Sequence, residues 1–251
     1  MRKFGLIGYP LGHSFSQKYF MKKFSRENIT DCSYNNFPLK HIKLLPGLIR
    51  SDPDLCGLNV TIPHKTAVLD FIDVREPAIN EIGAANVLKF KRTGNDITVY
   101  GFNTDVTGIR DSITPFLRDN VKNVLILGTG GSSKAVAWTM KTLGLNVTFV
   151  SRSGKDNILS YNDLTSDIIN INDIIINTTP LGMYPDISTK PDIDYNVLNE
   201  KHILFDLVYN PEFTLFLKAG MERGCTIITG LKMLYSQADR SWEIWNAVGS
   251  V

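Results

Sequence analysis

Lys65 closes the run N-V-T-I-P-H-K at residues 59–65. The β-branched triplet V-T-I favours a strand, and Pro63 ends that strand because proline has no N–H to donate to a ladder. The amine of Lys65 therefore stands where the chain leaves a predicted sheet. It is either a solvated charge at the end of a loop or a group aimed at a ligand.

Other polar residues in this half of the chain also follow predicted strands. Ser14 and Ser16 come after the first strand, and one helix N-cap accounts for only one of them. Asn86 follows the small residues G-A-A, which allow a backbone or a ligand to approach closely. Asp105 ends the run N-T-D, where, taken alone, it is best explained as the N-cap of a helix that begins at Val106.

Gln237 lies on a long helix predicted for the end of the chain, where, taken alone, it is a surface residue. Taken together, these hydroxyls, amides, one carboxylate and one amine are the groups needed to bind a small polyhydroxylated acid.

The sequence contains no G-x-S-x-G, H-E-x-x-H or Walker motif. We expect no metal, because the histidines have no metal-ligand spacing: His13, His41, His64 and His202.

A glycine-rich run, L-G-T-G-G-S-S-K-A at residues 127–135, stands between a predicted buried strand and a predicted helix. Gly128 permits a tight turn, and Gly130 lets backbone N–H groups reach a pyrophosphate at the helix N-terminus. Ser133 replaces the third glycine of the G-x-G-x-x-G fingerprint. A tight turn without a ligand is the alternative, but the strand–turn–helix context favours a dinucleotide.

Arg152 indicates which dinucleotide is bound. An NAD site has Asp or Glu after the second strand to bind the ribose 2′-hydroxyl, whereas this chain has Ser151-Arg152-Ser153 there. A guanidinium between two hydroxyls suits a 2′-phosphate through charge-assisted hydrogen bonds. A solvated loop arginine is the alternative, and we favour NADP(H).

The predicted elements divide the chain into two parts that differ in the order of their strands and helices. Before Asp105, strands at 4–7, 34–37, 55–62, 85–90 and 97–102 accompany helices at 16–28 and 42–49, and T-G-N-D predicts a hairpin between the last two strands. After it, strands at 124–127, 147–150, 174–176, 203–205 and 226–228 alternate with helices at 106–117, 132–143 and 212–219. This predicts an α/β protein whose first part has a mixed sheet and whose second part is a doubly wound parallel sheet, followed by a helix from 231 to about 248.

Composition excludes several classes of partner. The 251 residues carry 27 basic and 25 acidic side chains, a balance that argues against a nucleic-acid or anionic-membrane partner. No apolar run approaches the ~20 residues of a membrane span. The three cysteines are far apart and odd in number, so we expect no disulfide framework and a cytoplasmic location. The short apolar stretch at the N-terminus is interrupted by glycines, so it does not predict a signal peptide.

In order and over nearly the whole chain, the motifs resemble those of the shikimate dehydrogenase family. The matching runs are S-F-S at 14–16, N-V-T-I-P-H-K at 59–65, G-A-A-N at 83–86, N-T-D at 103–105, G-T-G-G-S-S at 128–133, S-R-S at 151–153, N-T-T-P-L-G-M at 177–183, D-L-V-Y-N-P at 206–211 and the G-L-x-M-L-x-x-Q-A run at 230–238. The resemblance implies NADPH-dependent, reversible reduction of 3-dehydroshikimate to shikimate in the route to chorismate and the aromatic amino acids. It also implies a monomer or homodimer.

The resemblance further implies a division of labour along the chain. Residues 1–104 would form a substrate-binding domain completed by the helix at 231–251, and residues 105–230 a Rossmann-like NADP-binding domain. The substrate would be held by Ser14, Ser16, Thr61, Lys65, Asn86, Asp105, Tyr209 and Gln237. Leu207 and Gly230 would lie near the nicotinamide, and NADP would be held by Gly128, Thr129, Gly130, Gly131, Ser132, Ser151, Arg152 and Ser153.

By the same resemblance, Lys65 is the general acid/base and Asp105 its neighbour that fixes its position. His64 is a rival proton donor, ranked second. One alternative activity is a quinate/shikimate dehydrogenase of broader specificity, a group that tends to use NAD and is disfavoured by Arg152. Another is a non-catalytic NADP(H)-binding regulator, which would have no need of a lysine paired with a carboxylate.

Overall fold

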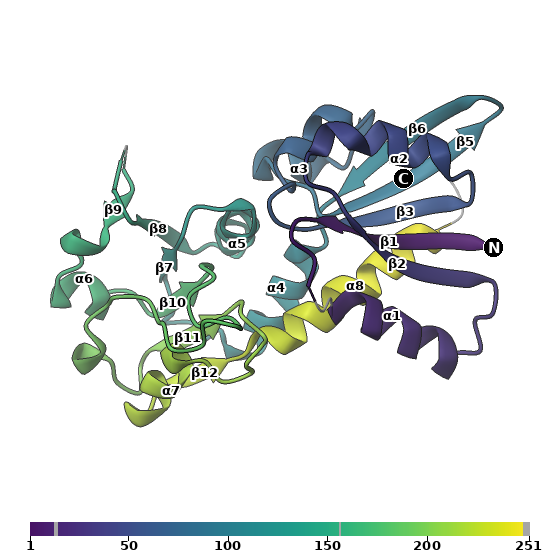
Figure 1. Ribbon diagram of the computed structural model, residues 1–251. Coiled ribbons are helices and arrows are strands. Elements are labelled where there is room, and N and C mark those ends of the chain that lie inside the picture. The colour runs from purple at the N-terminus through teal and green to yellow at the C-terminus, as the bar shows by residue number, and fades with distance from the viewer. Residues whose placement is uncertain (13–14, 156, 248–251) are drawn as a thin grey trace. The chain divides into compact units, whose positions relative to one another are not determined.

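The computed structural model describes residues 1–12, 15–155 and 157–247 of the chain. The chain divides into two compact units (Figure 1). The first unit comprises Met1–Thr104 and the segment from Ala238 onward, and the second comprises Asp105–Gln237. Helix α8 (Gly230–Asn246) therefore begins in the second unit and ends in the first.

Among the described residues of the first unit, six strands form one mixed sheet in the order β2-β1-β3-β5-β6-β4. The strands are β1 (Arg2–Gly8), β2 (Cys32–Pro38), β3 (Leu55–Val60), β4 (Val74–Arg75), β5 (Val87–Thr93) and β6 (Asp96–Phe102). β1 is parallel to both β2 and β3, whereas β5 is antiparallel to both β3 and β6. The predicted hairpin is confirmed, because Thr93 pairs with Asp96 across a turn that contains Gly94 at φ +59°.

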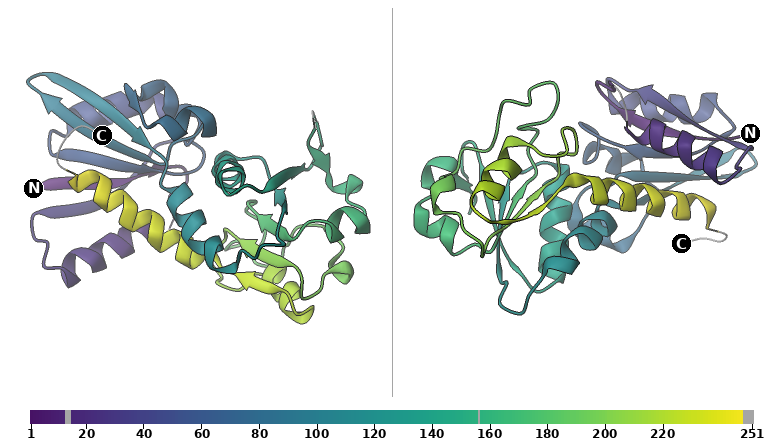
Figure 2. Two further views of the ribbon diagram at one scale, coloured as in Figure 1. Left: turned by 180° about the vertical axis from the view of Figure 1, so that it is seen from behind. Right: turned by 90° about the horizontal axis from the view of Figure 1, so that it is seen from below.

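Helices cover both faces of this sheet. Phe20 and Phe24 of α1 (Phe15–Arg26) and Trp245 of α8 pack against Phe4 on one face. Figure 2 shows α1 and the final turns of α8 on that face. The other face is covered by α2 (Leu45–Ser51), α3 (Pro77–Ile82) and the 3-10 helix η2 (Ala67–Phe71), with η1 (Ile42–Leu44) preceding α2.

The end of α8 is fixed to the first unit by Trp245. Its ring stacks on Phe4 with centroids 4.7 Å apart, and its Nε1 donates to the carbonyl of Leu88 at 2.9 Å. A Cβ on Gly57 would overlap the indole, so only glycine permits this approach. The fixed helix end in turn fixes Ser241, one turn earlier on α8.

The second unit is built on an all-parallel sheet in the order β12-β11-β10-β7-β8-β9. The strands are β7 (Asn123–Leu127), β8 (Asn146–Ser151), β9 (Leu159–Ser160), β10 (Ile174–Asn177), β11 (Ile203–Asp206) and β12 (Thr226–Ile228). β7, β10 and β11 are near-continuous buried runs, as expected for strands covered on both faces.

Helices of the second unit divide between the two faces of its sheet. α5 (Gly131–Thr142) contacts β7 and β8 as well as α4 (Asp105–Ile113). α6 (Ser166–Asn170) and α7 (Leu215–Glu222) bury Ile169, Phe216 and Leu217 against the opposite face. Short 3-10 helices, η3 (Thr114–Phe116), η4 (Tyr161–Asp163) and η5 (Tyr195–Val197), lie in the connections. No helix in the described part of the chain is long and apolar enough to span a membrane.

The predicted fold class is confirmed, and most predicted elements are present. The differences lie at element ends and in short elements. The helix predicted from Glu212 starts only at Leu215, because Thr214 is its N-cap and accepts from the Leu217 N–H. The helix predicted over 42–49 is split into η1 and α2, and β4, β9, α3 and α6 were not predicted from the sequence.

Candidate functional site

The register of the first sheet gathers several predicted residues at one of its edges. The parallel strands β1 and β3 end there, and antiparallel β5 begins there. Thr61, just past β3, donates its N–H to the Ile7 carbonyl at 2.9 Å, and the Val60 N–H donates to the Asn86 carbonyl at 2.8 Å. Ser16, on the first turn of the helix that follows β1, comes from the same edge. Thr61, Ser16 and Asn86 therefore lie at one end of the sheet.

Lys65 lies in the turn between β3 and η2 and is half-buried. Its carbonyl accepts the Ala85 N–H at 2.8 Å, which ties this turn to the segment that precedes β5. The neighbouring His64 is buried, and its Nε2 lies 2.5 Å from the Leu39 carbonyl, which can only accept. His64 is thus committed to a main-chain contact through this nitrogen.

Asn86 is buried, with its amide held by Thr104. The Asn86 Oδ1 accepts the Thr104 N–H at 2.7 Å, and its Nδ2 donates to the Thr104 Oγ1 at 3.1 Å. Because a backbone N–H can only donate, this pair fixes which end of the amide is the oxygen. Thr104 itself lies in the N-T-D run after β6, so the two motifs meet at the same edge.

Ser16 is half-buried and hydrogen-bonds through its side chain to Tyr34. Burial raises the pKa of the Tyr34 phenol, with the Ser16 hydrogen bond opposing that rise. The phenol is therefore neutral, and it donates to the Asn59 Oδ1 at 2.8 Å. Ser14, the other predicted serine, falls outside the described residues.

Three other predicted substrate residues belong to the second unit. Asp105 is buried and begins α4, as the N-terminal carboxylate of that helix. Tyr209 is half-buried in the loop after β11, and burial raises its pKa. Gln237 is half-buried on α8, one turn before Ser241.

The predicted glycine-rich turn connects β7 to α5 in the second unit. Gly128 has φ +111°, and a Cβ there would lie 2.7 Å from the Thr178 Oγ1, so the position requires glycine. Gly130 is the N-cap of α5 and is exposed, and no atom lies within 4 Å of where its Cβ would be. Ser133, the departure from the fingerprint, is buried and donates to the Gly130 carbonyl at 2.6 Å.

Arg152 follows β8, whose Val150 pairs with Leu127 at the end of β7. Because the two strands are parallel, the arginine and the glycine-rich turn lie at the same edge. Arg152 and Ser153 are exposed, whereas the half-buried Ser151 accepts the Gly154 N–H at 3.2 Å and closes the turn. Open backbone at the start of a helix fits the pyrophosphate of a dinucleotide, and an exposed guanidinium at the same edge fits the 2′-phosphate of NADP.

Leu207 and Gly230 also meet in the second unit. A Cβ on Gly230 would lie 2.6 Å from the Leu207 carbonyl and 2.8 Å from the Val208 carbonyl, so glycine alone lets α8 begin against this loop. The loop follows β11, and its shape is set by the buried Asp206, which accepts the Val208 N–H at 2.9 Å.

Asp206 also accepts from Asn177 Nδ2 at 3.0 Å and from the Thr214 hydroxyl at 2.5 Å. Burial raises the pKa of this carboxyl to about 6, and its three hydrogen bonds only partly oppose that rise. Asp206 and Asn177 stand in recognised motifs but were given no role from the sequence. Their contacts connect the ends of β10 and β11, where Asn177 pairs with Asp206.

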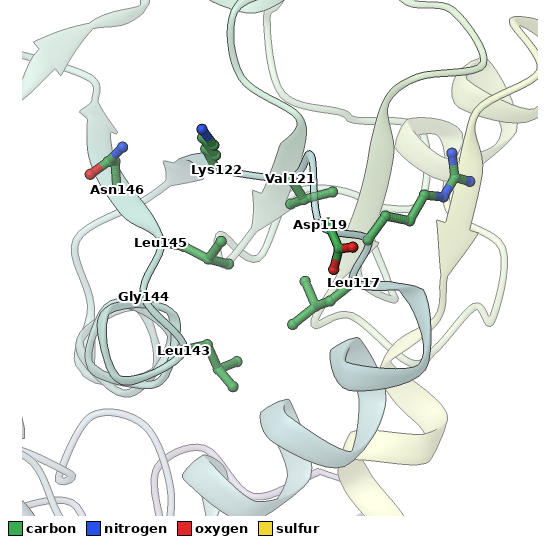
Figure 3. A pocket seen from close by; sticks show the side chains of 9 residues that line it. Leu117, Asp119, Val121, Lys122, Leu143, Gly144, Leu145 and Asn146 are labelled. Carbon is green, nitrogen blue, oxygen red and sulfur yellow. The ribbon is translucent and has the colours of Figure 1, made fainter.

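A cavity of about 360 Å³ in the second unit lies away from these residues (Figure 3). Lys122 and Asn146 on its rim stand at the amino ends of β7 and β8, and Leu117, Leu143 and Leu145 form its apolar wall. In open α/β sheets, ligands bind beyond the carboxyl ends of the strands. The cavity therefore lies at the opposite edge from the glycine-rich turn.

The sequence also missed residues in the first unit that hold the predicted ones. Asn59 and Thr104 stand inside recognised motifs, so a supporting role for them could have been predicted from the sequence. Tyr34 and Ser241 stand in no motif assigned to a site, and only the fold brings them to Asn59.

A parallel sheet with a glycine-rich turn and an arginine at its carboxyl edge defines a dinucleotide-binding α/β protein. The other unit gathers a lysine, an amide and hydroxyls at one edge of a mixed sheet, which suits a polar small-molecule substrate. Together these features fit the class of dinucleotide-dependent dehydrogenases.

The chain belongs to the shikimate dehydrogenase family. Residues 6–88 match the shikimate dehydrogenase substrate binding domain model. The chain is 36% identical to the shikimate dehydrogenase (NADP(+)) of Methanosphaera stadtmanae over 96% of its own length and 90% of that relative.

Solved structures agree. A chorismate mutase/shikimate 5-dehydrogenase fusion protein from Clostridium acetobutylicum is similar at a TM-score of 0.85 and 34% identity, over 99% of this chain and 92% of that one. The shikimate 5-dehydrogenase of Thermus thermophilus, in complex with NADP(H) and shikimate, has a TM-score of 0.84 and 26% identity, over 99% and 94%.

Proposed function

We propose that this protein is an NADP-dependent shikimate dehydrogenase that reversibly reduces 3-dehydroshikimate to shikimate. The observation that carries the proposal is the identity of 36% to a shikimate dehydrogenase (NADP(+)) over almost the full length of both chains. The Lys65 turn and the glycine-rich turn both lie within this aligned length, one in each unit.

The two units divide the work in this proposal. The first unit, with the end of α8, binds the substrate through Ser14, Ser16, Thr61, Lys65 and Asn86. The second unit binds NADP(H) through residues 128–132 and 151–153, with Leu207 and Gly230 beside the nicotinamide. Asp105, Tyr209 and Gln237 add a carboxylate, a phenol and an amide for the substrate.

The chemistry needs one proton for each hydride. When bound, NADPH supplies a hydride to the carbonyl carbon of the substrate, and the carbonyl oxygen gains an electron pair. The Lys65 ammonium donates its proton to that oxygen, which yields the alcohol and a neutral amine. In the reverse direction the neutral amine accepts the hydroxyl proton. Asp105 holds the lysine in position.

Arg152 supports NADP(H) rather than NAD. It stands at the end of β8, where a carboxylate would be needed for an unmodified ribose. The guanidinium instead offers several N–H donors in a planar fork, which match a 2′-phosphate.

The experiment measures initial rates by the near-ultraviolet absorbance of the reduced cofactor, with shikimate or quinate and with NADP or NAD. Shikimate with NADP should give the highest kcat/KM. A dominant rate on quinate with NAD would favour the quinate/shikimate dehydrogenase of broader specificity. NADPH binding without turnover of either acid would favour the non-catalytic regulator.

A further inference from the structure

A chain of side-chain hydrogen bonds crosses the interior of the first unit. The Tyr34 hydroxyl donates to Asn59 Oδ1 at 2.8 Å, and Asn59 Nδ2 donates to Ser241 Oγ at 3.0 Å. Ser241 Oγ lies 3.3 Å from Thr104 Oγ1, where either hydroxyl can donate. All four residues are buried, and Ser241 is completely inaccessible to solvent.

The two ends of this chain reach two residues of the proposed substrate site. At one end, Tyr34 is hydrogen-bonded by the Ser16 side chain. At the other end, Thr104 holds both atoms of the Asn86 amide group. Ser16 lies at the start of α1 and Asn86 immediately before β5, so the two side chains belong to different segments of the chain. Among the contacts described, these hydrogen bonds connect the two side chains.

Among the contacts described, helix α8 contributes one residue, Ser241, to this series of hydrogen bonds. A buried helical position is filled at least cost by an apolar residue, because a buried hydroxyl must keep a partner. Ser241 satisfies that need by accepting from Asn59, and it stands one turn after Gln237 on the same face of the helix. The Ser241 hydroxyl thereby joins Asn59 on β3 to Thr104, which follows β6.

We propose that Ser241 and Tyr34 are positioning residues that hold Asn86 and Ser16 in the orientation that binds a cyclic polyhydroxylated carboxylic acid. The inference rests on the proposed function. Neither Ser241 nor Tyr34 contacts the substrate in it. Ser241 acts on Asn86 through Thr104, Tyr34 acts directly on Ser16, and Asn59 joins the two. Loss of either residue therefore loosens groups that bind the ground state and the transition state alike.

The test compares Ser241→Ala and Tyr34→Phe with Ser112→Ala. Ser112 is a matched control: it is also a fully buried serine in a helix, but its hydroxyl donates to the Gly108 carbonyl within α4 at 2.7 Å. Each of the first two variants should raise the KM for shikimate by about 3–10-fold, the usual effect of one hydrogen bond. Their kcat and KM for NADP should stay within about 2-fold of wild type, and Ser112→Ala should leave all three unchanged.

A merely structural role would lower the thermal midpoint without this split between KM and kcat, and that result would overturn the inference. The double variant gives a second readout: its effect on KM should fall short of the product of the two single effects, because both break one chain. Should Ser241→Ala fail to fold, Tyr34→Phe, which keeps the ring, decides the question alone. A wild-type protein inactive on shikimate refutes the proposed function and this inference with it, whereas an active one with unchanged KM in both variants refutes the inference alone.

Discussion

His64 and Leu39 are joined by a buried contact, with the imidazole Nε2 2.5 Å from the Leu39 carbonyl oxygen. A carbonyl only accepts, so this ring nitrogen carries a hydrogen that is already engaged. The contact distinguishes two adjacent candidates for the proton donor. His64 faces into the core, whereas Lys65 is half-buried in the turn that leaves the sheet.

Replacing Lys65 with alanine should lower kcat by about 10²–10⁴-fold, the usual contribution of a general acid. The KM for shikimate should change less, because the other proposed substrate residues remain. Steady-state kinetics of Lys65→Ala beside Lys91→Ala, an exposed lysine on β5, would measure this difference. A Lys65→Ala enzyme with near wild-type kcat would assign the proton transfer to another group.

Gly128→Ala and Gly130→Ala should fail in different ways. At Gly128 the positive φ and the Thr178 hydroxyl both oppose a side chain, so the free energy of unfolding should fall by about 1–3 kcal/mol. Gly130 has space for a Cβ, so Gly130→Ala should keep its stability yet raise the KM for NADP. Denaturant titration and cofactor kinetics on both variants check this. An unchanged KM in Gly130→Ala would mean that no pyrophosphate approaches this backbone.

Arg152→Ala should raise the KM for NADP far more than the KM for NAD. A lost charge-assisted contact to phosphate is worth about 1.5–3 kcal/mol, or roughly 10–100-fold in KM. Arg118→Ala is the control, since Arg118 is an exposed arginine at the opposite edge of the same sheet. Equal increases for NADP and NAD would contradict a phosphate-binding role.

Asp206 should make the stability of the protein depend on pH. Its pKa is raised to about 6 by burial, which means that the folded state holds this proton more tightly than the unfolded state. The contribution of Asp206 to the free energy of unfolding therefore falls as pH rises from about 4 through 6, by about 3 kcal/mol at most.

The side chain in Asp206→Asn does not titrate. The free energy of unfolding of the wild type should therefore fall, relative to that of the variant, as pH rises from about 4 to 6. Urea titrations at several pH values would measure it. A difference that is constant with pH would show that Asp206 keeps an ordinary pKa in the folded state.

The sequence predicted the fold where signals are local and repeated. The buried runs of β7, β10 and β11 and the glycine-rich turn lie where their patterns indicated, because burial on both faces leaves little choice of residue. α3 and α6 escaped prediction because each is shorter than two full turns, which gives hydrophobic periodicity too few residues to register.

The buried hydrogen bonds and aromatic contacts of the first unit could not be predicted in the same way. Asn59 meets Ser241 across 182 residues of sequence, and neither residue type signals the other. The buried aromatic cluster shows the same limit, since Phe4 and Trp245 stack only once both ends of the chain have folded onto one sheet. Long-range contacts of this kind follow from topology rather than from any local pattern.

The most direct test of the central claim is the rate of cofactor reduction by purified protein with shikimate and NADP, compared with the same protein carrying Lys65→Ala. The account predicts rapid, NADP-dependent reduction by the wild type and a loss of about 10²-fold or more in kcat in the variant. A wild type that binds NADP but oxidises no shikimate would contradict it.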